Sequence, residues 1–121
     1  MKKKLIVIFL CTLTAQAFAE VKEADNQEIM SLMQSGVPII DIRRASEWQD
    51  TGVIKQSNLI TFFDKKGNYN LKDWLPKLKK IAKEGEPVII ICRSGRRSGI
   101  VSKFLDEQAN YSNVYNATGG I

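Results

Sequence analysis

The stretch IIICRSGRRSG, residues 89–99, joins three isoleucines to Cys92 and then to a polar segment of arginine, serine and glycine. A continuous apolar run of this kind is typical of a strand that is covered on both faces of a parallel sheet. Gly95 permits the backbone angles of a tight turn. The residues from Ser98 to about Glu107 then predict a helix, whose apolar face holds Ile100, Val101, Phe104 and Leu105. We therefore expect Cys92 at the carboxyl end of a buried strand, where open α/β sheets form their ligand crevice.

The rest of the chain predicts further alternation of strands and helices. Apolar residues at helical spacing indicate helices over 26–35 and 74–83. Asp73 is the expected N-cap of the second helix, because Pro76 then falls in its first turn, and Ser46 is the expected cap of a short helical turn. Apolar stretches follow at 39–42, 59–63, 88–91 and 114–115. This order predicts the α/β class, with a small parallel sheet flanked by helices on both faces.

The first nineteen residues have the layout of a secretory signal peptide. Three lysines, residues 2–4, precede an apolar run from Leu5 to Ala15, and Ala17 and Ala19 supply the small residues of a cleavage site. The apolar run is shorter than the roughly 20 residues of a membrane-spanning helix. We expect residues 1–19 to be a signal peptide, residues 20–121 to form one domain, and the protein to be periplasmic or otherwise exported, without a membrane partner after cleavage.

Composition excludes several classes of protein. The chain has 18 basic and 13 acidic residues, a net charge of +5, and removal of three lysines leaves 15 against 13, or +2. So small an excess predicts no nucleic-acid partner, and the lysines at 77, 79, 80 and 83 fit the solvated face of a helix. Histidine is absent from the sequence. This absence excludes Cys-His proteases, Ser-His-Asp hydrolases and histidine-based metal sites, and we expect no metal.

Cys92 would be the single cysteine of the exported domain, and its surroundings favour a thiolate. Backbone N–H groups in a tight curl converge on an anion, and a helix that starts near Ser98 adds its positive end. Arg93, Arg96 and Arg97 add full charges. These features lower a cysteine pKa from its ordinary value of about 8.5, so Cys92 could act as a nucleophile without a base. The alternative is a small buried hydrophobe, which is common for an unpaired cysteine.

The length of the loop separates two chemistries that use a cysteine in an anion cradle. Phosphate-ester and arsenate chemistry needs a cysteine, five intervening residues and an arginine, but Ser98 occupies that arginine position. Arg97 instead closes a loop of six residues that begins with Cys92. The shorter loop fits one sulfur atom bound to cysteine better than a tetrahedral phosphate. A cysteine-based phosphatase or arsenate reductase therefore remains the less favoured alternative.

Four segments, taken in their order along the chain, resemble the rhodanese family of sulfurtransferases. CRSGRRS (92–98) is similar to the active-site loop of that family, and DIRRASEW (41–48) is similar to its Asp-x-Arg-x-x-x-Glu-aromatic segment. NVYNATGGI (113–121) resembles the closing strand with its Gly-Gly pair. In TGVIKQS (51–57), Val53, Lys55 and Gln56 stand where the family usually has histidine, proline and glycine. The resemblance implies that residues 20–121 form a rhodanese-like domain.

The resemblance also implies a reaction and a set of site residues. Cys92 would take the outer sulfur of thiosulfate or a similar small anionic donor as a covalent persulfide, without a cofactor, and pass it to cyanide or a thiol. The donor and the persulfide would be bound by the loop residues Arg93, Ser94, Gly95, Arg96, Arg97 and Ser98. Asp41, Arg43 and Glu47 would give structural support. A non-catalytic persulfide carrier, or a rhodanese-like binding module, is the alternative function.

Overall fold

The computed structural model describes residues 20–121, so the expected signal peptide lies outside the described residues. The elements follow in the order β1 (Lys22–Ala24), α1 (Asn26–Gln34), β2 (Ile39–Asp41), α2 (Ala45–Thr51), β3 (Asn58–Leu59), α3 (Leu71–Lys79), β4 (Val88–Ile91), α4 (Arg96–Gln108) and β5 (Val114–Ala117). In the part of the chain that the structure describes, every helix is too short or too polar to span a bilayer.

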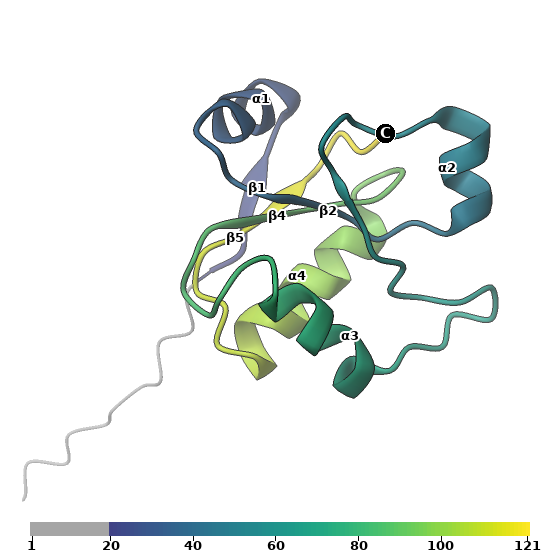
Figure 1. The fold of residues 1–121 in the computed structure, drawn as a ribbon. Helices are drawn as coiled ribbons and strands as arrows, with labels where there is room; N and C mark the ends of the chain where they lie inside the picture. The colour runs from purple at the N-terminus through teal and green to yellow at the C-terminus, as the bar shows by residue number, and fades with distance from the viewer. Residues whose placement is uncertain (1–19) are drawn as a thin grey trace, which may run out of the picture.

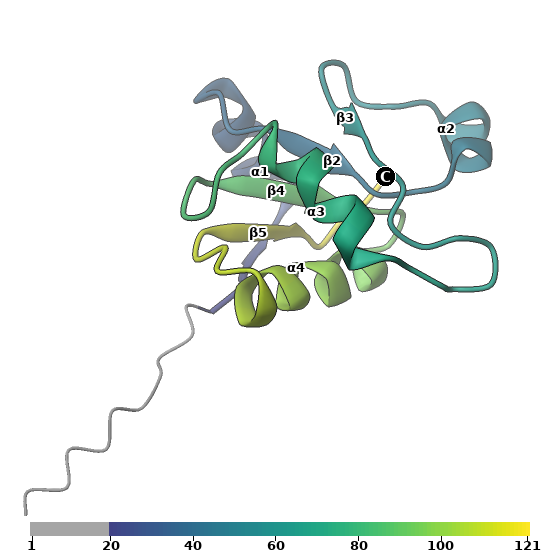
Figure 2. The same ribbon diagram turned by 60° about the horizontal axis from the view of Figure 1, so that its bottom comes forward.

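The strands form one five-stranded sheet in the order β1-β5-β4-β2-β3, and all neighbouring strands are parallel. The helix α1 covers one face, and α3 and α4 cover the other (Figures 1 and 2). The predicted fold class is therefore confirmed. The strand β4 is buried along its whole length between β2 and β5, as its run of apolar residues predicts.

Alternation along β4 decides on which face the thiol lies. Val88 and Ile90 pack in the core under α3 and α4, while Ile89 and Ile91 pack in the core under α1. Because side chains alternate between the faces of a strand, Cys92 belongs to the same face as Ile90. The thiol therefore lies on the side of the sheet that carries α4, next to the point where that helix begins.

Three helices begin earlier than the sequence predicts. Asn70, not Asp73, caps α3, and its side chain accepts the Asp73 N–H at 3.3 Å. Arg44, not Ser46, is the N-cap of α2, where the Glu47 carboxylate accepts the Arg44 N–H at 2.9 Å. The helix α4 begins at Arg96, two residues before the expected start at Ser98, with Gly95 as its N-cap. Acceptors upstream satisfy an N–H of the first turn in α3 and α4, from Asn70 and from the Cys92 sulfur, whereas in α2 the Glu47 side chain reaches back to the N–H of the N-cap itself.

Two further expectations about elements are wrong. Pro76 lies inside α3 and not in its first turn, and the helix ends at Lys79 rather than Lys83. Proline is tolerated there because Pro76 and Lys72, whose carbonyl loses its helical partner, both lie on the exposed side of the helix. The edge strand β1 has only three residues and was not predicted, since so short a segment carries no periodic signal.

The C-terminal segment crosses the start of the β4–α4 connection. The Ile121 N–H donates to the Cys92 carbonyl at 3.0 Å, and Gly120 has a left-handed φ of 59°. A Cβ atom on Gly120 would lie 2.0 Å from the Arg93 carbonyl oxygen. This close approach of two backbones requires glycine, and it holds the segment after β5 against the start of the β4–α4 connection.

We expect Gly120→Ala to destabilise the domain more than Gly67→Ala. Both glycines have positive φ, but nothing lies within 4 Å of a Cβ atom built on Gly67. The control should lose about 1 kcal/mol from backbone strain alone, and Gly120→Ala should lose at least about 2 kcal/mol more because backbone must move. Urea unfolding measures both free energies, and equal losses would show that the contact with Arg93 is unimportant.

Candidate active site

The site is built by the connection between β4 and α4, which curls around the sulfur of Cys92. Gly95 adopts a left-handed φ of 86°, a conformation that turns the chain back toward Cys92. The N–H groups of Gly95 and Ser98 donate to Sγ at 3.2 and 3.3 Å, and the Ser98 hydroxyl lies 3.2 Å from the same atom. These groups and the N-terminus of α4 surround the sulfur with positive ends of dipoles.

Burial and hydrogen bonding act in opposite directions on the Cys92 thiol. Burial raises its pKa, because a thiolate loses hydration in the core. Hydrogen bonds from the Ser98 hydroxyl, when its proton faces Sγ, and from the N–H groups of Ser98, Ser94 and Gly95 lower the pKa by more than burial raises it. The pKa of Cys92 therefore lies below its ordinary value, as the sequence predicts for a thiol in an anion cradle.

Cys92 is 0% exposed, which the sequence does not predict for a nucleophile at a crevice. The thiol belongs to the core cluster under α3 and α4, as a small buried hydrophobe would. A hydrophobe, however, needs no convergent donors, and two N–H groups aimed at Sγ distinguish this site from ordinary core packing. The sulfur of Cys92 therefore lies beneath its loop, hydrogen-bonded to two N–H groups and closed to solvent.

Two ion pairs hold the elements around the loop. Arg97 binds the Glu47 carboxylate with both terminal nitrogens, at 2.9 and 2.5 Å, and so connects α4 to α2. The Arg97 hydrogen bond holds the pKa of Glu47 at about 2, although partial burial raises it. Asp41 and Arg43 form a second pair that is almost completely buried, with a shortest distance of 2.9 Å. Arg43 also donates to the Gly52 carbonyl, so this pair connects the end of β2 to the end of α2.

A cationic cavity of about 440 Å³ lies beside the loop. Arg96 and Arg97 line it, whereas Arg93 is exposed and does not. Sequence reasoning missed two further cations of its lining, Arg44 and Lys65. Arg44 stands in the quoted DIRRASEW segment, and Lys65 belongs to the Lys-Lys-Gly-Asn turn at 65–68, but neither has a local signal that connects it with Cys92.

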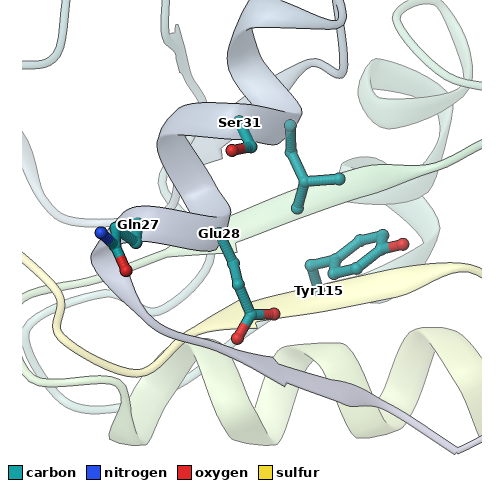
Figure 3. Close-up of a pocket in the computed structure, with 5 residues that line it drawn as sticks. Gln27, Glu28, Ser31 and Tyr115 are labelled. Atoms are coloured by element: carbon teal, nitrogen blue, oxygen red, sulfur yellow. The ribbon is translucent and has the colours of Figure 1, made fainter.

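A larger groove of about 510 Å³ lies on the other face of the sheet. Figure 3 shows Gln27, Glu28 and Ser31 of α1 above Tyr115 of β5. Tyr115 packs against the core cluster under α1, so this groove is separated from Cys92 by the sheet. The smaller cavity, not this groove, therefore lies beside the Cys92 loop.

The fold and the site together define a class of protein: a parallel α/β domain with a cysteine loop between its central strand and a helix. The family model "Rhodanese-like domain" matches residues 25–121, and the chain belongs to this family. Comparison with curated proteins finds no significant match.

Solved structures agree in fold. The Rhodanese-like Domain Protein from Staphylococcus aureus is 25% identical, with a TM-score of 0.59 over 83% of this chain and 87% of that chain. Rv0390 from M. tuberculosis is 23% identical, with a TM-score of 0.65 over 84% and 81%. A Rhodopseudomonas palustris protein of unknown function, described as a possible tyrosine phosphatase, is 24% identical, with a TM-score of 0.62 over 83% and 76%.

Glu47→Gln tests the ion pair that connects α2 to the loop. At pH 7 we expect the variant to lose about 2 kcal/mol of unfolding free energy, since a charged hydrogen-bond partner of Arg97 is removed. The pKa of Glu47 falls from 4.5 to about 2 on folding, so the pair contributes fully above about pH 4.5 and its contribution is lost as the pH falls through 2.

The difference between wild type and Glu47→Gln should therefore shrink as denaturant unfolding is repeated from pH 5 down to about pH 2. Glu107→Gln is the control, because Glu107 pairs with Lys103 at 3.9 Å on the surface and should contribute less than about 0.5 kcal/mol. A difference that stays constant over this pH range would contradict the assignment.

Proposed function

We propose that the protein is a sulfurtransferase, which moves a sulfane sulfur from thiosulfate or a similar anionic donor to cyanide or a thiol through a Cys92 persulfide. The single observation that carries the proposal is the convergence of the Gly95 and Ser98 N–H groups on Sγ. Preorganised donors of this kind stabilise a sulfur anion within a site that excludes water. Such an anion can attack without a general base, which fits a chain without histidine.

The reaction consists of two displacements at sulfur. The Cys92 thiolate attacks the outer sulfur of thiosulfate; a new S–S bond forms, the bond to the sulfonate sulfur breaks, and sulfite leaves with that electron pair. The acceptor then attacks the terminal sulfur of the persulfide. With cyanide, thiocyanate forms and the electron pair of the S–S bond returns to Sγ as a thiolate. No cofactor takes part in either step.

The residues around the loop would bind the donor, stabilise the thiolate and support the structure of the site. Arg44, Lys65 and Arg96 line the cavity beside the loop and would attract an anionic donor. Ser94, Gly95 and Ser98 stabilise the thiolate through the N–H groups that lower its pKa. Asp41 and Arg43 give structural support to the loop between β2 and α2. Because Cys92 is buried, loop residues must shift slightly before a donor reaches Sγ.

The proposed cellular setting follows from residues 1–19. Removal of these residues as a signal peptide would place the domain in the periplasm or outside the cell, with a small anionic sulfur donor and a thiol acceptor as partners. A charge of +2 on residues 20–121 favours neither nucleic acid nor a membrane surface as a partner. Intact mass spectrometry of the exported protein would identify the cleavage site.

A non-catalytic persulfide carrier or binding module is the second candidate, and the burial of Cys92 favours it. A carrier would hold the sulfur stoichiometrically until a partner opened the loop. Turnover distinguishes the two functions, since a carrier loads one sulfur and stops. A phosphatase stays the least favoured function, because Ser98 stands where that chemistry needs arginine.

Wild-type protein should release sulfite continuously from thiosulfate in the presence of cyanide, and Cys92→Ala should lose essentially all of this activity. Without cyanide, wild type should gain the mass of one sulfur atom, which Cys92→Ala should not. Loading without turnover would favour the carrier, and equal rates for both proteins would refute the role of Cys92. Cys92-dependent hydrolysis of an aryl phosphate would instead favour a phosphatase.

Lys65→Glu should raise the KM for thiosulfate several-fold at low salt, because it replaces a cation of the cavity by an anion. The effect should shrink as ionic strength rises and screening shortens the range of the charge. Lys66→Glu is the matched control: it changes the net charge equally, but Lys66 does not line the cavity. Similar KM values for both variants would show that the donor does not pass through this cavity.

A further inference from the structure

A buried polar side chain that sequence reasoning missed lies behind the contact between Cys92 and Ser98. Asn116 of β5 is only 4% exposed, and its Oδ1 accepts the Ser98 hydroxyl at 2.6 Å. Its Nδ2 donates to the Glu23 carboxylate of β1 at 2.9 Å and to the Gly95 carbonyl at 3.2 Å. Asn116 thus connects the N-cap and the first turn of α4 with the edge strand β1.

The orientation of the Asn116 amide follows from the chemistry of its partners. A carboxylate and a backbone carbonyl can only accept hydrogen bonds. Glu23 and Gly95 therefore both require the NH₂ group of the amide, and the carbonyl oxygen must point toward Ser98. The short distance of 2.6 Å agrees with an O–H···O hydrogen bond in that direction.

Ser98 has one hydroxyl proton and two neighbours that could take it. When the proton points at Asn116, Ser98 presents only lone pairs to the Cys92 sulfur, 3.2 Å away. In that state the hydroxyl accepts the S–H of a thiol but gives nothing to a thiolate. Ser98 can stabilise a thiolate through its hydroxyl only after it leaves Asn116, whereas the two N–H donors on Sγ stay in place.

We propose that Asn116 is a positioning residue of the active-site loop, which takes the Ser98 hydroxyl proton and so withholds that hydrogen bond from the Cys92 sulfur. Glu23 supports this function, because its carboxylate fixes the amide orientation. The consequence for sulfur transfer rests on the function proposed above, but the titration of the thiol does not. The network therefore withholds one of the hydrogen bonds that can stabilise the thiolate, and the thiolate gains it only when the hydroxyl turns from Asn116 to Sγ.

The charged groups around the sulfur do not provide another explanation. Arg97 of α4 is paired with Glu47 of α2, and Asp41 and Arg43 after β2 are paired with each other. Glu23 of β1 contacts the network through Asn116. A neutral substitution at Asn116 changes none of these charges, so a change in the titration of Cys92 would come from the hydrogen bonds.

Asn116→Leu is the central variant. Leucine has the same branched arrangement of heavy atoms as asparagine and leaves no room for a water molecule that could replace Oδ1, so the Ser98 hydroxyl can turn to the sulfur. The Gly95 carbonyl keeps the Gly99 N–H at 3.0 Å. We expect the pKa of Cys92 to fall, with a thiolate-to-thiol ratio at fixed pH that is roughly tenfold higher, as one hydrogen bond to a charged group is added. Ultraviolet absorbance of the thiolate measures this ratio, with Cys92→Ala as the blank.

A double-mutant cycle with Ser98→Ala separates this function from a merely structural one. If Asn116 acts through the Ser98 proton, Asn116→Leu should leave the pKa of Cys92 unchanged when residue 98 is alanine. If Asn116 only holds the loop in shape, its loss should raise the pKa, with or without the hydroxyl. A pKa that rises or stays the same in the single variant would overturn the proposal.

Asn116→Val is a second variant, which keeps the proposal testable if Asn116→Leu fails to fold, because a smaller β-branched side chain suits a buried strand. Valine also offers no acceptor to the Ser98 hydroxyl. The pKa of Cys92 should fall in this variant and stay unchanged when residue 98 is alanine; an equal fall in both backgrounds would overturn the proposal. If wild type transfers no sulfur, the proposed function fails while these titrations still decide the role of Asn116.

Discussion

The structure depends on one constraint: the backbone between β4 and α4 must direct two N–H groups at the same sulfur atom. This is possible only because Gly95 adopts a left-handed conformation, and a side chain there would also meet the Thr118 carbonyl at 2.7 Å. The central position of β4 holds one end of the curl, and the N-terminus of α4 holds the other. The sheet, α4 and the segment after β5 thus all help to fix the conformation of this one turn.

The contacts around the loop also distinguish cations that hold helices and strands together from cations that line the cavity. Arg97 has both terminal nitrogens on Glu47, so most of its hydrogen-bonding capacity is used to hold α2 against α4. Arg43 is similarly engaged with Asp41 and the end of α2. If the protein binds an anionic donor as proposed, its attraction would therefore fall to Arg44, Lys65 and Arg96, which line the cavity. A count of arginines in the sequence cannot make this distinction, since it depends on partners that lie far away in the chain.

Sequence reasoning identified the parts of the site that are local. The apolar run before Cys92 and the amphipathic segment after it predict the strand, the turn and the helix, because each signal lies within a few residues. Asn116 and Glu23 reach the loop only through the pairing of β5 with β4 and β1, and β1 is too short to be predicted. The start of α3 was missed for another reason: Asn70 and Asp73 are both good caps, and only the fold selects between them.

Burial of the sulfur strengthens the effect of the neutral donors around it. A dipole acts more strongly on a charge in a dry site than in water, so the hydrogen bonds of the loop can offset the desolvation of a thiolate. The cations that would recognise an anionic donor stay outside this shell, in the cavity. Recognition by charge and activation by dipoles are thus separate in space. This separation would let a charged donor and a neutral thiol acceptor use the same sulfur in turn, because the groups that stabilise Sγ do not depend on the charge of the reaction partner.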